Sequence, residues 1–271
     1  MLKTCLNGAT TMPQSLEQDL ADAAGAGFAG VELWWDKVKA YLTGHSAADL
    51  KTLLASHNLV PVSLCPLTIW PFRDTAPARV SYREAVELAP QIGCDLVIAC
   101  PDFRPARMTR DEALGIHAGE LRDMATLAGA NGVRLAIEPI GRHTLCAGSA
   151  DALSLIERAG SPDNVGLLID TFHYFRSQVG DAELDAIPID KLFIIHVNDT
   201  EDGAIDELND ANRVYPLEGV IPIKAMLSRV IARGYDGYLS VEIFRPEYWN
   251  QPSAEVARQS MSSVQALINS L

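Results

Sequence analysis

Four ionisable side chains end four successive hydrophobic segments in the second half of the chain. Glu138 follows LAI, Asp170 ends VGLLID, His196 ends LFIIH and Glu242 follows LSV. A buried charge is costly unless it is paired or bound to a metal, and a helix cap or an arginine could account for one such residue but hardly for four. Three carboxylates and a neutral imidazole suit a divalent cation. The sequence therefore predicts that these four side chains bind one metal ion, with Mn²⁺ or Zn²⁺ favoured over Co²⁺ or Mg²⁺.

Other residues near the ends of hydrophobic segments are candidates for contacting a substrate. His173 lies three residues after Asp170, in the first turn of the expected next helix, where it could donate a hydrogen bond to a substrate oxygen. Tryptophans after the second and third segments could cover the apolar face of a ring. We expect His173 to take part in catalysis beside Glu138 and Glu242. The candidate substrate-binding residues are Asn7, Trp35, Trp70, His173, Arg213 and Arg245.

The elements that must position these residues alternate along the chain. Short, nearly continuous hydrophobic runs are typical of parallel strands that are buried on both faces. We predict strands at Lys3–Leu6, Gly30–Leu33, Val60–Cys65, Asp95–Cys100, Val133–Glu138, Val165–Asp170, Leu192–Val197 and Tyr238–Ile243. Amphipathic stretches separate them, and the first begins at Ser15 with Gln18 three residues later, a helix-capping pattern.

Eight strands that alternate with helices, without a linker, predict an α/β fold of the (β/α)8 TIM barrel class, with one domain over residues 1–271. An open, doubly wound sheet is the alternative, and it is weaker because no glycine-rich phosphate loop follows a strand. Active sites of such barrels lie at the carboxyl ends of the strands, where the candidate ligands lie.

Composition excludes several functional classes. The net charge of −13 disfavours nucleic acid and anionic membranes as partners, and no segment reaches the ~18 apolar residues of a membrane span. The amino-terminal segment lacks the apolar centre of a signal peptide. The five cysteines show no metal-binding or disulfide spacing, so we expect free thiols in a reducing compartment. These features favour a cytoplasmic enzyme that acts on a small molecule, and they leave homo-oligomerisation open.

The strings LLIDTFHYF, IIHVND and SVEIF resemble the xylose isomerase-like superfamily of sugar isomerases and epimerases, across essentially the whole chain. CLNGATT, HVNDTED, NRVYPLEGVIPI and FRPEYW are similar to the inosose isomerases within it, enzymes of inositol catabolism. The resemblance implies the same four metal ligands. The chain departs from the family at Gly8, where an acidic residue is usual, and at Pro216–Gly219, which reads Pro-Leu-Glu-Gly instead of Pro-Gly-x-Gly.

The resemblance implies a metal-dependent isomerase or epimerase of a sugar or a cyclic polyol ketone, above all an inosose (2-keto-myo-inositol). Glu138 and Glu242 would transfer a proton through a metal-stabilised enediolate. The alternative is a dehydratase of an inosose or a dehydroshikimate-like substrate on the same scaffold. A multi-zinc nuclease would need more histidines and a basic groove. A sugar-binding protein without catalysis would not need two flanking carboxylates.

Overall fold

Eight hydrophobic segments form the parallel strands of a closed barrel in the computed structural model, which describes residues 2–271. Around the barrel the strands follow the order β1, β10, β7, β6, β5, β4, β3, β2, so the first and last barrel strands pair and close it. The predicted barrel and strand positions are confirmed. The strands are β1 Lys3–Asn7, β2 Gly30–Trp34, β3 Val60–Ile69, β4 Leu96–Pro101, β5 Arg134–Ile137, β6 Val165–Asp170, β7 Leu192–Val197 and β10 Tyr238–Val241.

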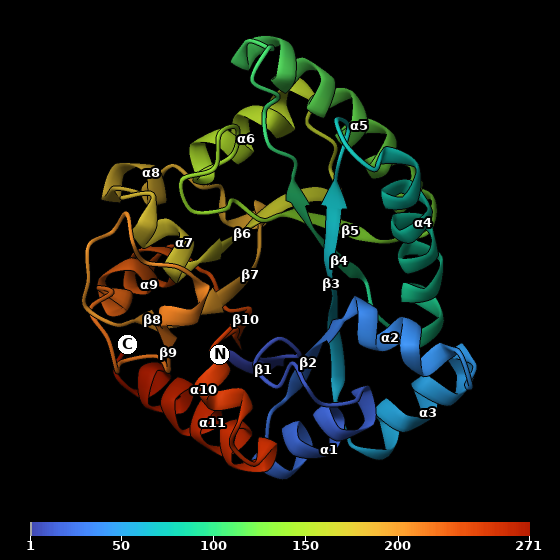
Figure 1. The fold of residues 1–271 in the computed structure, drawn as a ribbon, viewed down its shortest axis with the longest axis vertical. Coiled ribbons are helices and arrows are strands. Elements are labelled where there is room, and N and C mark those ends of the chain that lie inside the picture. Colours follow the sequence, from blue (N-terminus) through green and yellow to red (C-terminus); the bar gives the residue numbers. More distant parts are fainter. Residues whose placement is uncertain (1) are drawn as a thin grey trace.

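Helices form a ring outside the strands (Figure 1). The predicted start of the first helix is confirmed, because the Ser15 hydroxyl accepts the backbone N–H of Gln18 and caps α1. The helices are α1 Leu16–Ala26, α2 Trp35–Leu42, α3 Ala47–Ser56, α4 Thr75–Ile92, α5 Arg110–Ala130, α6 Ser149–Arg158, α7 Thr171–Arg176, α8 Asp181–Asp185, α9 Ile223–Ala232, α10 Pro246–Trp249 and α11 Ser253–Asn269. Within residues 2–271, no helix is both long enough and apolar enough to cross a membrane.

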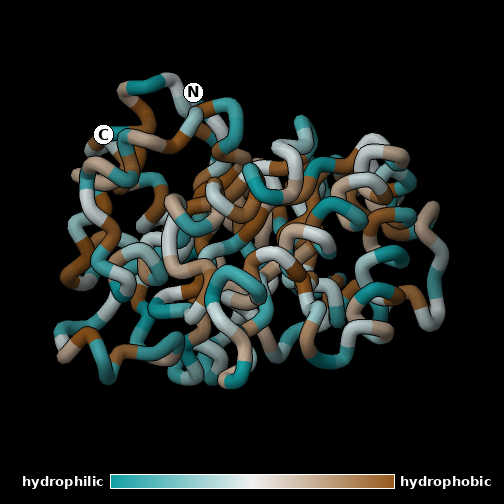
Figure 2. Tube along the Cα trace, turned by 90° about the horizontal axis from the view of Figure 1, so that it is seen from above, coloured by the Kyte–Doolittle hydropathy of each residue, from teal (hydrophilic) through white to brown (hydrophobic). Residues whose placement is uncertain are grey.

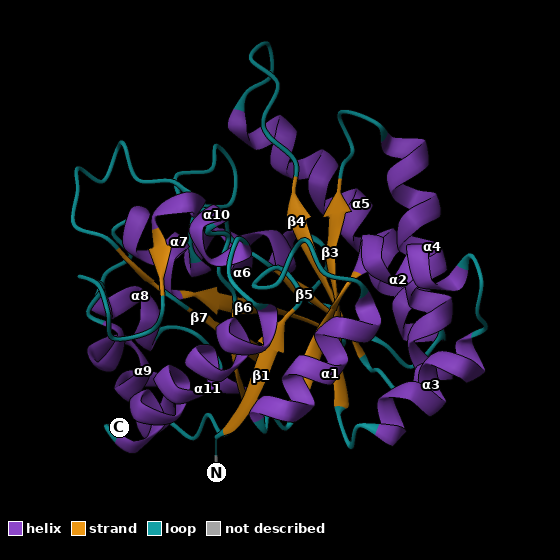
Figure 3. Cartoon of the chain, turned by 60° about the horizontal axis from the view of Figure 1, so that its bottom comes forward, coloured by secondary structure: helices purple, strands orange, loops and turns teal. Residues whose placement is uncertain are grey.

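The core has two parts. A large hydrophobic cluster fills the space between the strands and the helices, while a smaller one fills the barrel interior with residues that include Cys5, Cys65 and Ile98. All five cysteines are free thiols, as predicted. In the hydropathy view, hydrophilic stretches are prominent in the outer loops (Figure 2). The arrows of β3 and β4 lead to loops on one face, and both chain ends lie on the opposite side (Figure 3).

A short hairpin follows β7 and was not predicted. Its two strands, β8 (Asp199–Thr200) and β9 (Arg213–Val214), pair antiparallel and carry Arg213 back towards the barrel. The buried Asp199 carboxylate fixes the next loop, since its Oδ1 accepts the backbone N–H of Ile221 at 2.8 Å. Within that loop Leu217 has a φ of +74°, a left-handed conformation. Leu217 therefore adopts a backbone conformation that glycine takes without strain.

We expect Leu217→Gly to be more stable than Leu217→Ala by about 1 kcal/mol, because both remove the side chain but only glycine adopts a positive φ without strain. Urea unfolding of the two variants measures the difference. The matched control is Gly115→Ala within α5, where a Cβ would meet nothing within 4 Å. There alanine should be more stable than glycine by about 0.5–1 kcal/mol. If Leu217→Ala were as stable as Leu217→Gly or more stable, the positive φ at this position would not strain a residue that carries a Cβ atom.

Candidate metal centre

The four predicted ligands meet at the carboxyl ends of four neighbouring strands. Glu138 directly follows β5, Asp170 ends β6, His196 lies in β7, and Glu242 directly follows β10. These strands are adjacent in the barrel. One ligand atom from each residue lies within 4.8 Å of the others, and all four residues are buried. The structure thus brings the four predicted residues together, and their binding of a metal ion stays a prediction.

The imidazole of His196 lies among the carboxylates. Its Nδ1 is 3.1 Å from Glu242 Oε2, 3.3 Å from Glu138 Oε1 and 3.9 Å from Asp170 Oδ2. Neither ring nitrogen has an aligned hydrogen-bond partner among the described residues, although both are buried. An unpartnered Nδ1 inside a cluster of carboxylate oxygens is a nitrogen that a cation would complete. The donor set and its spacing therefore fit a divalent metal ion.

The candidate ligands shift the pKa values of one another. Burial raises the pKa of Glu242 to about 7, and the neighbouring Glu138 carboxylate acts in the same direction. Burial alone would lower the pKa of His196, but the carboxylates of Glu242 and Glu32 outweigh it and raise that pKa well above its ordinary value. The surrounding carboxylates thus favour a positive charge at His196, which is the charge that a bound cation would supply.

Arg213 reaches the ligands from β9. Its side chain is fully buried, and Nη1 donates to Asp170 Oδ2 at 2.8 Å and to Glu242 Oε2 at 3.1 Å. Burial would raise the pKa of Asp170, but the Arg213 guanidinium holds it well below its ordinary value. Arg213 Nη2 lies 3.2 Å from His173 Nε2, and since a guanidinium cannot accept, Nε2 is the acceptor. His173 Nδ1 then carries the hydrogen, and no partner for it exists among residues 2–271.

Asn198 is a residue of the site that the sequence reasoning missed. It is fully buried, and its Nδ2 donates to Asp170 Oδ2 at 3.0 Å and to the Glu242 carbonyl oxygen at 3.1 Å. Its Oδ1 accepts the backbone N–H of Phe172 at 2.9 Å. Asn198 therefore fixes the start of α7 and two ligand segments together. Its place two residues after the ligand His196 was the available signal.

Glu32 was also missed, and Asn7 lies deeper than expected. Glu32 extends from β2 into the barrel, where its Oε1 is 3.0 Å from His196 Nε2. Asn7 Nδ2 donates to Glu32 Oε1 and to Glu242 Oε1, both at 3.1 Å. Asn7 is fully buried, so its amide hydrogens are directed at protein carboxylates and not at the rim. This geometry differs from the predicted role of Asn7 in substrate binding.

Two other predicted substrate contacts have structural partners. Trp35 begins α2 and is 4% exposed, with Nε1 donating to Ser81 at 2.6 Å, so it packs between α2 and α4. The sequence placed it on the rim because the start of α2 directly after β2 was not foreseen. Arg245 pairs with Glu201 at 2.7 Å and reaches the carbonyl oxygen of Arg213 at 3.5 Å. It therefore supports the segment that carries Arg213.

The loops after β3, β4 and β5 bring aromatic residues together. Trp70 directly follows β3. The Arg73 guanidinium carbon lies over its ring, 4.3 Å from the ring centroid. The Phe103 ring lies 4.3 Å from that of His143, and Phe103 is 51% exposed. Arg73 pairs with Asp102 at 2.9 Å and so joins two of these loops. Trp70 remains a candidate wall for the apolar face of a substrate.

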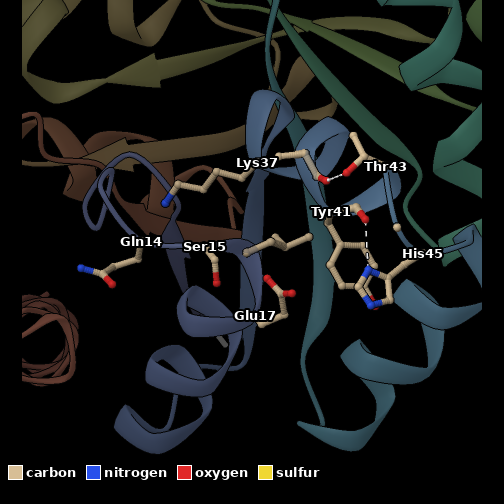
Figure 4. A pocket seen from close by; sticks show the side chains of 10 residues that line it. Gln14, Ser15, Glu17, Lys37, Tyr41, Thr43 and His45 are labelled. Atoms are coloured by element: carbon tan, nitrogen blue, oxygen red, sulfur yellow. Dashed lines mark hydrogen bonds between the residues drawn. The ribbon is translucent and has the colours of Figure 1, made fainter.

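A separate groove lies between the start of α1 and the end of α2 (Figure 4). Its volume is about 310 Å³, and none of the metal ligands lines it. His45 in this groove stacks on Tyr41 at 4.2 Å. Lys37 donates to the Gly8 carbonyl oxygen at 2.9 Å and pairs with Asp19 at 2.6 Å.

Gly8 itself lies close to β2. A Cβ atom at this position would lie 3.0 Å from Trp34 Cβ, so the site favours glycine.

A metal ion that binds only the native state should raise the melting temperature. At a free metal concentration of about 100 times the dissociation constant, the free energy of unfolding should rise by about 2.7 kcal/mol. We expect Asp170→Ala and His196→Ala to lose most of that gain, because each removes a ligand. Thermal scans with and without Zn²⁺ measure it. Glu120→Gln, a buried acid paired with Arg79 outside the barrel, should keep the full gain. An undiminished gain in both alanine variants would place the ion elsewhere.

Comparisons with known proteins agree with this geometry. A model of the xylose isomerase-like TIM barrel family matches residues 20–267. An inosose isomerase of Bacillus velezensis is 31% identical, over 99% of this chain and 98% of that protein. The crystal structure of the IOLI protein with a binding zinc atom matches with a TM-score of 0.92, 28% identity and 99% coverage of both chains. A 3-dehydroshikimate dehydratase of Pseudomonas aeruginosa is 27% identical over 94% of this chain, which spans 39% of that protein.

Proposed function

Because the chain belongs to the xylose isomerase-like TIM barrel family, we propose that it is a metal-dependent isomerase of a cyclic polyol ketone, an inosose. In this reaction the ketone moves to the neighbouring ring carbon by transfer of protons. The proposal is supported by the likeness to an inosose isomerase along nearly the whole chain, and by the four buried side chains that could hold a divalent metal ion.

The single observation that carries the proposal is the placement of two carboxylates beside one imidazole. Glu138 Oε1 and Glu242 Oε2 lie 3.3 and 3.1 Å from His196 Nδ1 and come from strands on either side of β6 and β7. A ketone held between them has one carboxylate available to remove a proton and another to return one. A protein that only binds sugars would not need this pair.

Glu138, Asp170, His196 and Glu242 would hold the ion, and Zn²⁺ or Mn²⁺ suits this set best. When bound, the ion supplies a Lewis acid for the substrate carbonyl. Glu138 and Glu242 move the protons. His173, whose Nδ1 has no partner among residues 2–271, stays a candidate donor to a substrate oxygen, and Arg213 holds the ligand carboxylates in place through Nη1.

Incubation of the metal-loaded protein with a panel of inososes and ketohexoses in D2O, followed by NMR, tests the proposal. We expect an inosose to be converted to an isomer of equal carbon skeleton that carries deuterium at the carbon that receives the proton. Conversion of ketohexoses alone would show that the substrate is wrong. A product with no solvent deuterium would count against the carboxylates as proton carriers, unless they are shielded from solvent.

A dehydratase is the second candidate, and the likeness to the 3-dehydroshikimate dehydratase favours it. Removal of the proton next to the carbonyl is common to both reactions, so the same carboxylates would serve. The two outcomes differ in mass: an isomerase leaves the mass of the substrate unchanged, while a dehydratase removes one water. Mass spectrometry of the same reaction mixtures therefore separates the two candidates.

A further inference from the structure

Glu32 is a buried acid for which the proposed proton transfer has no use. It lies in the middle of β2 and is 1% exposed. An ionised carboxylate in a barrel interior is costly unless its partners compensate for the lost water. The structure provides such partners: Ser63 Oγ donates to Glu32 Oε2 at 2.6 Å, and Asn7 Nδ2 donates to Oε1 at 3.1 Å.

Strand register gathers these polar groups in one layer of the barrel. Asn7 of β1 lies opposite Glu32 of β2, and Glu32 lies opposite Ser63 of β3. Across the barrel, the same layer contains His196, whose Nε2 is 3.0 Å from Glu32 Oε1. The contact is an ion pair without the alignment of a full hydrogen bond. Glu32 thus contacts Nε2 of the His196 ring, while Nδ1 of the same ring faces the carboxylates of the candidate metal ligands.

We propose that Glu32 is a positioning residue of the metal centre: its carboxylate holds the far edge of the His196 imidazole. A lone pair on Nε2 would be repelled by this carboxylate, so the hydrogen belongs on Nε2 and Nδ1 is left to bind the ion. Outer carboxylates of this kind orient a ligating histidine and make it a stronger donor. The inference rests on the metal centre proposed above.

Asn7 extends the same arrangement to a second ligand. The amide that donates to Glu32 Oε1 also donates to Glu242 Oε1, while its Oδ1 accepts the backbone N–H of Ala9 at 2.9 Å. Asn7 is therefore fixed by its own loop and holds Glu32 and Glu242 at a constant separation. Through this bridge, Glu32 supports the orientation of two of the four ligands.

Glu32→Gln tests the inference, because glutamine keeps the size and an acceptor oxygen but removes the charge. Zn²⁺ affinity is measured by competition with a chromophoric chelator, and the visible absorption of Co²⁺-loaded protein reports the ligand geometry. We expect the variant to bind Zn²⁺ about 10–100-fold more weakly than the wild type and to show an altered Co²⁺ spectrum. Glu120→Gln, the same change at a buried acid outside the centre, should alter neither.

A Zn²⁺ affinity within about twofold of the wild type, with an unchanged Co²⁺ spectrum, would overturn the role of Glu32 and leave the metal centre standing. Failure of the wild-type protein itself to bind Zn²⁺ or Co²⁺ would overturn both. If Glu32→Gln does not fold, Ser63→Ala replaces it, since it removes only the donor to Oε2. Ser63→Ala should bind Zn²⁺ more weakly than the wild type, but with a smaller loss than expected for Glu32→Gln. An unchanged Zn²⁺ affinity of Ser63→Ala would overturn the proposal.

Discussion

Exhaustive chelation should abolish turnover, and Zn²⁺, Mn²⁺, Co²⁺ or Mg²⁺ added back should restore it to different degrees. Without the ion the site lacks the Lewis acid that would polarise a substrate carbonyl, although Glu138 and Glu242 remain in place beside His196. Rates are measured on protein shown by elemental analysis to be free of metal, before and after reconstitution with each ion.

The control for chelation is the fold itself. The circular dichroism spectrum and a cooperative melting transition of the chelated protein should be retained, because the hydrophobic core between strands and helices does not involve the centre. Loss of activity together with loss of the fold would not establish a catalytic role. Protein that is free of metal, folded and fully active would show that the ion has no part in the reaction.

Glu138→Gln and Glu242→Gln should each lower turnover by about 10²–10⁴-fold, the contribution of a positioned acid or base. Glutamine keeps the length of each side chain and can still offer one oxygen, but it cannot accept the proton of the substrate. Both carboxylates lie within 3.3 Å of His196 Nδ1, but they come from strands on either side of β6 and β7, so we expect that neither can take over the role of the other.

Glutamine is also a weaker ligand, so metal content is measured in each variant and rates are taken at saturating metal. Exchange of solvent deuterium into the substrate, followed by NMR, separates the two roles: the variant that lacks the base should lose both exchange and turnover. Glu120→Gln, away from the barrel interior, should keep the wild-type rate. Full turnover of either variant at saturating metal would exclude that residue as a proton carrier.

The sequence was sufficient for the barrel strands and for the convergence of the four candidate metal ligands, because both leave strong signals. Each strand is a hydrophobic run, and each ligand is an ionisable group at the end of one. Barrel geometry then brings the strand ends together, so Glu138, Asp170, His196 and Glu242 could be placed without coordinates. The helix start at Ser15 was predicted because capping depends on neighbouring residues.

The sequence could not show on which side of a strand a side chain lies, and Glu32 was missed for this reason. Glu32 lies between Val31 and Leu33, and a period of two is equally consistent with an exposed or an interior acid. Only the register with Asn7 and Ser63 shows that it faces the barrel interior. The aligned polar residues of three neighbouring strands were the missed signal.

Local turns account for the remaining differences. Trp35 was expected on the rim, but α2 begins at this residue directly after β2, and the helix directs its indole to Ser81. The strands β8 and β9 have two residues each, too few for any periodic pattern. Arg213 was predicted to bind substrate, but the structure buries its side chain and directs Nη1 at the carboxylates of Asp170 and Glu242.

The pairing of β1 with β10 sets a condition on how the chain acquires its metal during synthesis. The hydrogen bond from Asn7 to Glu242 joins residues 235 positions apart, so it forms only when the last barrel strand has docked. A nascent chain that ends before β10 contains Glu138, Asp170 and His196 but lacks the fourth ligand and its support. Tight capture of the proposed ion would therefore coincide with closure of the barrel, and the ion would stabilise finished molecules in preference to incomplete ones.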